Sequence, residues 1–300
     1  MAFTDIVVSA EGFTSLPERF RDKERRSAWI DANKPGAKLD SFLEGPTFPP
    51  DGALFVTDIP HGRIFRISAD GDWSLVADYD GWPNGMRWQS DGHLYIADYK
   101  RGILRLRAGS SVPEPVFETH RSEGFKGCND LWFAGDGTLY FTDQGQTGLH
   151  DSTGRVYRAD VSTGQLDVLL SNGPSPNGLV TAANDSVLFV AMTRACEVWR
   201  LPLFASGTSK VQLFARLPAG NSGPDGMALD SHGNLYVCHA SRGAVFVFSP
   251  DGDEIGMVDC RHLGRTTTNL AFAGPDRTRV FVTVSDTGVI ASADVSALAA

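Results

Sequence analysis

Residues 224–239 read PDGMALDSHGNLYVCH and contain a short unit that occurs six times in this chain of 300 residues. The unit begins with a carboxylate or carboxamide side chain, has a turn residue eight positions later and an apolar residue twelve positions later. We call the first positions the marked residues: Glu44, Asn84, Asn129, Asn177, Asp225 and Asn269. They are separated by 40, 45, 48, 48 and 44 residues, and both offsets hold in every copy. The pattern predicts one hairpin, repeated six times.

The sequence around each unit has the periodicity of short strands. Residues 61–67 (HGRIFRI) and 73–77 (WSLVA) alternate apolar and polar positions between Gly and Asp, which is typical of strands. Four short strands in a period of 40 to 48 residues indicate a propeller blade. Because each blade buries its faces only against its neighbours, six blades should close into a ring. We therefore predict an all-β, six-bladed β-propeller of four-stranded blades, forming one domain over residues 1–300, with all marked residues at one end of its central channel.

Two segments precede the first repeat. Residues 5–9 (DIVVS) are predicted to form a strand that completes the last blade and removes a free sheet edge. Residues 17–40 are highly charged and predict a short helix, with Phe20 and Trp29 touching the body. This second segment has two interpretations: a solvated surface helix, or a lid over the mouth of the site, since long insertions often serve binding.

Composition narrows the classes of protein. The net charge of -9 argues against a nucleic-acid partner, and no apolar run of about 18 residues exists to span a membrane. The first residues lack the basic and apolar regions of a secretory signal, so a cytoplasmic location is expected. Cys128, Cys196, Cys238 and Cys260 lack metal-type spacing, which favours reduced thiols.

The six marked residues are the candidate site. Convergent carboxylate and amide oxygens suit a divalent cation, most of all Ca²⁺, with Mg²⁺, Mn²⁺ and Zn²⁺ as alternatives. An unpaired buried amide costs roughly 1–3 kcal/mol, so several at one level need a partner. Metal ligation is the preferred interpretation for Glu44, Asn177 and Asp225. For Asn84 and Asn269, capping of local backbone is equally consistent with the pattern.

Fourteen positions after the marked residues, three copies carry an aspartate: Asp58, Asp98 and Asp143. Aspartate commonly accepts hydrogen bonds from nearby backbone N–H groups, so we expect these residues to cap turns within the blade. The alternative is a second layer of polar groups around the mouth of the channel.

Four motifs in order resemble the gluconolactonase / senescence marker protein (regucalcin) / luciferin-regenerating-enzyme family: residues 44–46 (EGP), 129–130 (ND), 176–179 (PNGL) and 224–226 (PDG). The resemblance covers roughly residues 43–290. It implies a six-bladed propeller that usually hydrolyses lactones with a divalent cation in its channel. It also implies metal ligation by Glu44, Asn177 and Asp225, with Asp225 as general base, and binding of either the cation or the substrate by Asn129.

The chain departs from the family two residues before the Asn-Asp pair. Sugar-lactonase members typically carry Arg there, whereas this chain has Gly127. Unless Lys126 substitutes as the donor, a more apolar pocket and a less polar lactone are expected. With Asn129, the residues expected to bind substrate are Lys126, Asn84 and Asn269.

Three functions follow, of which the first is preferred. The first is metal-dependent hydrolysis of a small lactone, in which the metal acts as a Lewis acid and Asp225 as the base, or only as the group that positions water. The second keeps the site and changes the substrate to a phosphotriester or fluorophosphate. The third is a non-enzymatic propeller that binds a peptide or protein, because this fold serves many functions.

Overall fold

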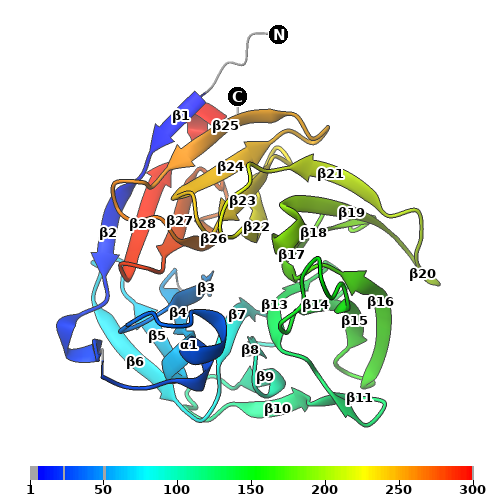
Figure 1. Cartoon of the computed structure of the whole chain (residues 1–300), viewed down its shortest axis with the longest axis horizontal. Helices are drawn as coiled ribbons and strands as arrows, with labels where there is room; N and C mark the ends of the chain where they lie inside the picture. The colour runs from blue at the N-terminus through cyan, green and yellow to red at the C-terminus, as the bar shows by residue number, and fades with distance from the viewer. Residues whose placement is uncertain (1–5, 23, 50–51, 299–300) are drawn as a thin grey trace.

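The computed structural model describes residues 6–22, 24–49 and 52–298, and six sheets radiate in it from a central axis (Figure 1). Each of blades one to four is formed by one continuous stretch of the chain. In blades one and two these are β3 (Leu43–Thr47), β4 (Leu54–Asp58), β5 (Arg63–Ile67), β6 (Trp73–Asp78), β7 (Pro83–Trp88), β8 (Leu94–Asp98), β9 (Gly102–Leu106) and β10 (Glu114–Phe117). In blades three and four they are β13 (Cys128–Phe133), β14 (Leu139–Asp143), β15 (Gly154–Asp160), β16 (Gln165–Gly173), β17 (Pro176–Thr181), β18 (Val187–Met192), β19 (Glu197–Phe204) and β21 (Gln212–Arg216).

The last two blades recruit strands from the start of the chain. Blade five contains β22 (Pro224–Leu229), β23 (Leu235–His239), β24 (Ala244–Phe248), β25 (Glu254–Asp259) and β1 (Ile6–Ser9). Blade six contains β26 (Thr267–Ala273), β27 (Arg279–Val284), β28 (Val289–Asp294) and β2 (Glu11–Ser15). Short elements complete the fold: β11 (Thr119–His120), β12 (Glu123–Gly124), β20 (Gly207–Thr208), α1 (Ala28–Asn33), and the 3-10 helices η1 (Glu18–Phe20), η2 (Ile59–His61), η3 (Thr193–Ala195) and η4 (Ser296–Leu298).

The predicted six-bladed propeller is confirmed, with one correction at the N-terminus. Strand β1 does not complete the last blade; it pairs in parallel with β25 and extends blade five. The following strand, β2, pairs antiparallel with β28 and supplies the fourth strand of blade six. The prediction that the N-terminal region closes the ring is therefore confirmed. The closing strand, however, is formed by residues 11–15. Asp5 lies outside the described residues.

The core follows the ring. Strand residues alternate between the two faces of a blade, so Phe55 packs toward blade two while Val56 packs toward blade six. In the described part of the chain, one apolar cluster fills each of the six interfaces between neighbouring blades. A further cluster joins α1 to blade one through Trp29, Ile30, Phe42 and Ile59.

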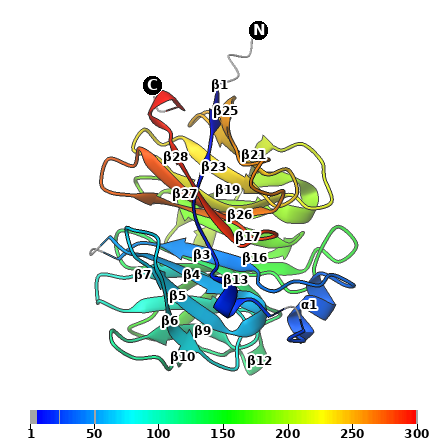
Figure 2. The same ribbon diagram turned by 90° about the vertical axis from the view of Figure 1, so that its left-hand side faces the viewer.

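Side on, the ring is a thick disc, and α1 stands out from one of its faces (Figure 2). Within the described residues, no helix has the length and apolar character needed to cross a bilayer. The four cysteines are free thiols in the structure.

Candidate active site

The marked residues lie where the pairing of each inner strand is interrupted. In blade five, Pro224 pairs with His239, but the next paired residue is Met227, which faces Val237. A corresponding irregularity occurs at the marked residue, or directly after it in blade one, in all six inner strands. Such bulges redirect side chains and are frequent beside active sites. Here they release the marked side chains from the blade surface at one end of the channel.

Glycine directly after the marked residue lets neighbouring blades meet at the axis. A Cβ atom on Gly178 would lie 2.4 Å from the Asp225 carbonyl oxygen, and one on Gly226 would lie 2.1 Å from Asn269 Oδ1. Gly45 and Gly85 face the next blade in the same way. These four copies therefore need glycine at this position, because a side chain there would push two inner strands apart.

Five of the six marked residues line one cavity of about 80 Å³: Glu44, Asn84, Asn129, Asn177 and Asp225. All five are buried. The sixth, Asn269, does not line it. Its Nδ2 donates to Glu44 Oε2 at 2.8 Å, and its Oδ1 accepts from the backbone N–H of Leu270 at 2.8 Å. Asn269 thus combines the backbone contact of a cap with the positioning of Glu44.

The three cavity amides differ in their contacts. Asn129 Nδ2 donates to Gln144 Oε1 at 3.0 Å, which leaves the amide oxygen for another partner. Asn177 hydrogen-bonds the Asp225 carboxylate. Asn84 Oδ1 is buried and, among the described residues, finds no donor. A buried amide oxygen without a partner indicates a position that a cation or a substrate hydroxyl would satisfy.

Asp130 is a third carboxylate that the sequence interpretation did not assign to the site. It is fully buried, and its Oδ1 accepts from the Leu131 N–H at 2.8 Å. Its Oδ2 faces Asn269 Nδ2 at 3.4 Å. The signal was available: Asp130 occupies the position after the marked residue, where four of the six copies have glycine.

The negative charges of the buried carboxylates raise the pKa values of their neighbours. Burial, followed by the charges of Asp225 and Asp130, raises the pKa of Glu44 well above its usual value. Burial also raises the pKa of Asp225 to about 7, with Asp130 adding to the rise while Lys34, Asn177 and Arg194 oppose it. Like charges in a desolvated site favour the neutral form, and an opposite charge relieves the penalty.

These residues fit a hard divalent cation. The donors are carboxylate and amide oxygens, the ligands that Ca²⁺ and Mg²⁺ prefer. The unsatisfied Asn84 oxygen and the mutual repulsion of the carboxylates are both features that a bound cation would correct. In the part of the chain that the structure describes, no cluster of three or more His, Cys, Asp and Glu side chains forms a metal site by itself. The candidate set depends on amides as well.

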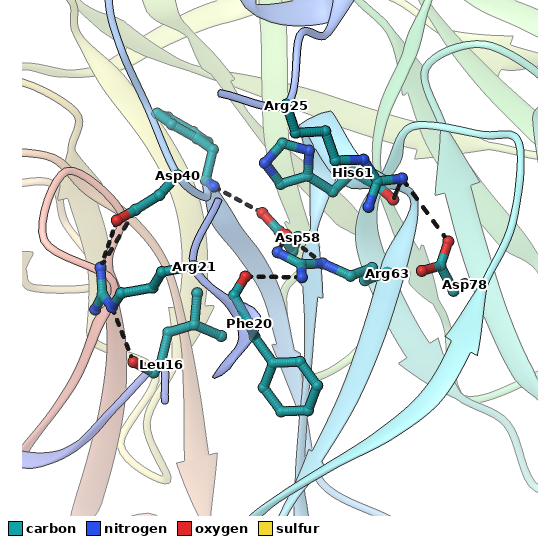
Figure 3. A network of polar contacts seen from close by, with 10 residues as sticks. Leu16, Phe20, Arg21, Arg25, Asp40, Asp58, His61, Arg63 and Asp78 are labelled. Carbon is teal, nitrogen blue, oxygen red and sulfur yellow. Dashed lines mark hydrogen bonds and ion pairs between the residues drawn. The ribbon is translucent and has the colours of Figure 1, made fainter. Parts of the chain in front are cut away.

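Polar contacts fasten the described part of the segment 17–40 to blade one (Figure 3). Arg63 forms an ion pair with Asp58 and donates a hydrogen bond to the Phe20 carbonyl oxygen at 2.8 Å. Arg21 pairs with Asp40 at 3.1 Å, so the two ends of the segment are held together.

From this anchored segment, α1 and the residue after it reach the cavity. Trp29, Asn33 and Lys34 contribute to its lining. Asn33 Oδ1 also accepts from Gln146 Nε2 at 2.9 Å, which joins the segment to a loop of blade three.

The Gly127 departure has a structural reason. A Cβ atom at this position would lie 2.6 Å from the ring of Tyr99 and the backbone φ is +151°, so an arginine fits only if the ring and the backbone shift. Lys126 does not substitute, because its Nζ donates to Thr153 Oγ1 at 2.7 Å and it does not line the cavity. The expectation of a more apolar pocket was wrong: the lining is mostly polar and includes Lys34 and Arg194.

The aspartates fourteen positions after the marked residues are confirmed as caps that accept hydrogen bonds from backbone N–H groups. Asp58, Asp98 and Asp143 accept from the backbone N–H groups of Phe42, Trp82 and Gly127 at 2.8, 3.1 and 2.9 Å. Each donor stands two residues before a marked residue. These carboxylates therefore fix the course of the chain as it enters the inner strand.

Fold and site together define a six-bladed propeller with an oxygen-donor site at one mouth of its channel. Residues 42–286 match the SMP-30/Gluconolactonase/LRE-like region, and the chain belongs to this family. It is 28% identical over 296 residues to a gluconolactonase of Zymomonas mobilis, covering 87% of this chain and 82% of the relative. It is 28% identical over 255 residues to lactonase drp35 of Staphylococcus aureus, covering 80% and 76%. The structure of regucalcin, a calcium-binding protein from Agrobacterium tumefaciens, superposes with a TM-score of 0.75 at 20% identity, covering 96% and 94% of the two chains.

Proposed function

We propose that this protein is a lactonase that depends on a divalent cation, most of all Ca²⁺. One observation carries the proposal: five buried, oxygen-bearing side chains from five different blades surround a single cavity. Membership of the family and the two lactonase relatives support hydrolysis of a lactone ring.

Glu44, Asn177 and Asp225 would hold the cation, with Asn129 oriented toward either the cation or the substrate. The bound cation would polarise the ring carbonyl and stabilise negative charge on its oxygen. In the overall reaction, the oxygen of water bonds to the carbonyl carbon and the ring C–O bond breaks. The ring oxygen becomes a hydroxyl, and the new carboxylic acid loses a proton at neutral pH.

Asp225 is the candidate base. A carboxylate whose pKa lies near neutrality can accept a proton from water at the pH where the enzyme works, which is the condition for efficient general base catalysis. Cation binding would lower that pKa, so a second role for Asp225 is to orient the water. Asn84 offers an unpaired amide oxygen to a substrate hydroxyl.

The segment 17–40 is proposed to be the lid of this site. Trp29 packs against Phe42 with ring centroids 5.1 Å apart, and both side chains line the cavity. Apolar groups at the mouth exclude water, which strengthens electrostatic interactions inside.

A substrate panel with and without chelator tests the function. Purified protein is assayed on small lactones and on organophosphate triesters, before and after treatment with EDTA and after Ca²⁺ is restored. The proposal expects lactone hydrolysis that EDTA abolishes and Ca²⁺ restores. Turnover of the triesters alone would favour a phosphotriesterase, and no turnover with no bound metal would favour a non-enzymatic binding propeller.

Asp225→Asn separates the two roles of Asp225 when cation binding is measured independently by calorimetry. Loss of turnover with retained cation binding supports a base. Unchanged turnover would eliminate Asp225 from proton transfer.

A further inference from the structure

Two basic side chains stand at the mouth of the cavity, and neither comes from an inner strand. Lys34 directly follows α1, and Arg194 lies in η3, between β18 and β19. Both line the cavity that contains Asp225. Arg194 also lines an adjoining hollow of about 560 Å³ whose other walls include Gln144, Gln146 and Ser175.

Neither cation has a carboxylate partner within 4.0 Å among the described residues. Lys34 lies over the ring of Phe42, with its nitrogen 5.0 Å from the ring centroid. Burial lowers the pKa of Lys34, and the charge of Asp225 opposes this effect. Within the described residues, the one side-chain hydrogen bond of Arg194 runs from Nη1 to the Asn221 carbonyl at 3.2 Å, which leaves most of its donors for a ligand. A partly desolvated ammonium without an ion pair is costly unless a ligand supplies the anion.

The charge of the site explains why two such groups are useful. Glu44, Asp130 and Asp225, together with one divalent cation, leave an excess of one negative charge when all three carboxyl groups are ionised. That field would repel an anionic substrate. The positive charges of Lys34 and Arg194 make the electrostatic potential at the mouth of the cavity positive. The substrate group farthest from the reacting carbonyl would lie there.

We propose that the preferred substrate is a lactone that carries a second acid group as a free carboxylate, and that Lys34 and Arg194 bind this carboxylate. The inference rests on the proposed lactonase activity. A guanidinium and an ammonium form charge-assisted hydrogen bonds with a carboxylate that are stronger than those a neutral hydroxyl provides. The pair would supply basic groups that Gly127, packed against the ring of Tyr99, does not provide. Hydrolysis then converts a monoanionic lactone and water into an open-chain dicarboxylate and one proton.

A matched pair of lactones tests the proposal. D-Glucaro-1,4-lactone carries a carboxylate where D-glucono-1,4-lactone has a hydroxymethyl group. With the Ca²⁺-loaded protein, we expect kcat/KM to be at least about tenfold higher for the first, the ratio expected for one charge-assisted contact. Lys34→Gln and Arg194→Gln should each raise KM for the glucaro-lactone about tenfold relative to KM for the glucono-lactone, with any change in kcat shared by both lactones.

Lys126→Gln is the matched control, because it removes a cation from the same face of the ring but outside the cavity. It should leave kcat and KM unchanged for both lactones. A preference for the glucono-lactone overturns the proposal. Equal losses on both lactones in Lys34→Gln also overturn it, because Lys34 would then act through Asp225 and not on the substrate's acid group.

Binding of the open-chain products tests the substrate proposal separately if neither lactone is opened, and the broader panel of lactones described above then decides the lactonase activity. Calorimetry then compares glucarate with gluconate on the wild type and on Lys34→Gln. Tighter binding of glucarate that is lost in the variant supports selection of a second acid group by the two cations. Equal binding of the two products refutes it.

Discussion

Asp225 is a buried carboxyl group whose pKa burial raises to about 7, so its protonation is coupled to folding. In the unfolded chain, the group titrates near its ordinary value of 3.8. The native protein therefore binds more protons between these values, and its free energy of unfolding falls as pH rises from about 4 to about 7. The raised pKa of Glu44 acts in the same direction. In EDTA we expect the melting temperature to decrease over this range, with a loss from Asp225 on the order of 4 kcal/mol as an upper bound.

Asp225→Asn removes one titrating group at the same size and should reduce this dependence in EDTA, while Glu44 retains its own contribution. Saturating Ca²⁺ should flatten it in the wild type, since the cation favours the ionised form. Thermal melts in EDTA at several pH values provide the measurement, and a pH-independent wild type would contradict the pKa assignment.

Single residues also show what sequence can predict. The constant offsets in the sequence identified the marked residues, because a repeated hairpin places equivalent residues at equivalent points of each blade. Five of the marked residues do surround one cavity. Lys34 and Arg194 have no place in that period. They reach the cavity through the path of an insertion and of a 3-10 turn, and no local pattern specifies either path.

At the scale of the element, the glycine that follows four of the six marked residues controls how closely the inner strands approach. Gly178→Ala would place a methyl group 2.4 Å from the Asp225 carbonyl oxygen, so backbone must move. We expect a loss of about 3 kcal/mol, as for other overpacked sites, together with weaker cation binding.

Gly92→Ala is the matched control for this substitution. Gly92 has a φ of +79° but nothing within 4 Å of its Cβ position, so only the left-handed backbone is penalised, at about 1 kcal/mol. Urea titrations compare the two variants. A larger loss in Gly92→Ala would show that blade contact at the axis is not the constraint.

The N-terminal strands give a graded test of ring closure. Removing residues 1–9 deletes β1, an extra strand on blade five, whereas removing 1–16 also deletes β2, which completes blade six. The longer deletion loses buried Leu16, worth on the order of 2 kcal/mol, and exposes the edge of β28. We expect it to lower the melting temperature at least twice as much and to cause aggregation, as measured by calorimetry and light scattering. Equal effects would contradict closure by β2.

The strand that sequence analysis assigned to closure was one element too early for a physical reason. Residues 6–9 and 11–15 are both short and lie next to each other in the chain, and both can pair with an exposed edge. Their partners, β25 and β28, are also neighbours in the ring. Strand propensity identifies an edge strand, but the choice between adjacent blades depends on packing across the whole ring.

At the scale of the whole molecule, the ring concentrates unfavourable charge at its axis, and a cation would convert that cost into stability. Binding only to the native state adds RT ln(1 + [L]/Kd), so each tenfold increase in free Ca²⁺ above Kd should add about 1.4 kcal/mol. Starting from protein treated with EDTA, the melting temperature should rise in proportion to the logarithm of free Ca²⁺. Glu44→Gln should weaken this response, since it removes a carboxylate from the cavity, whereas Lys126→Gln, outside the cavity, should retain it. Because the contributing side chains come from separate blades, the stabilisation should also appear as slower amide exchange in all six inner strands. No response to Ca²⁺, Mg²⁺, Mn²⁺ or Zn²⁺ at millimolar concentration would remove the cation from the proposed function, and stabilisation confined to one blade would show that the ion binds elsewhere.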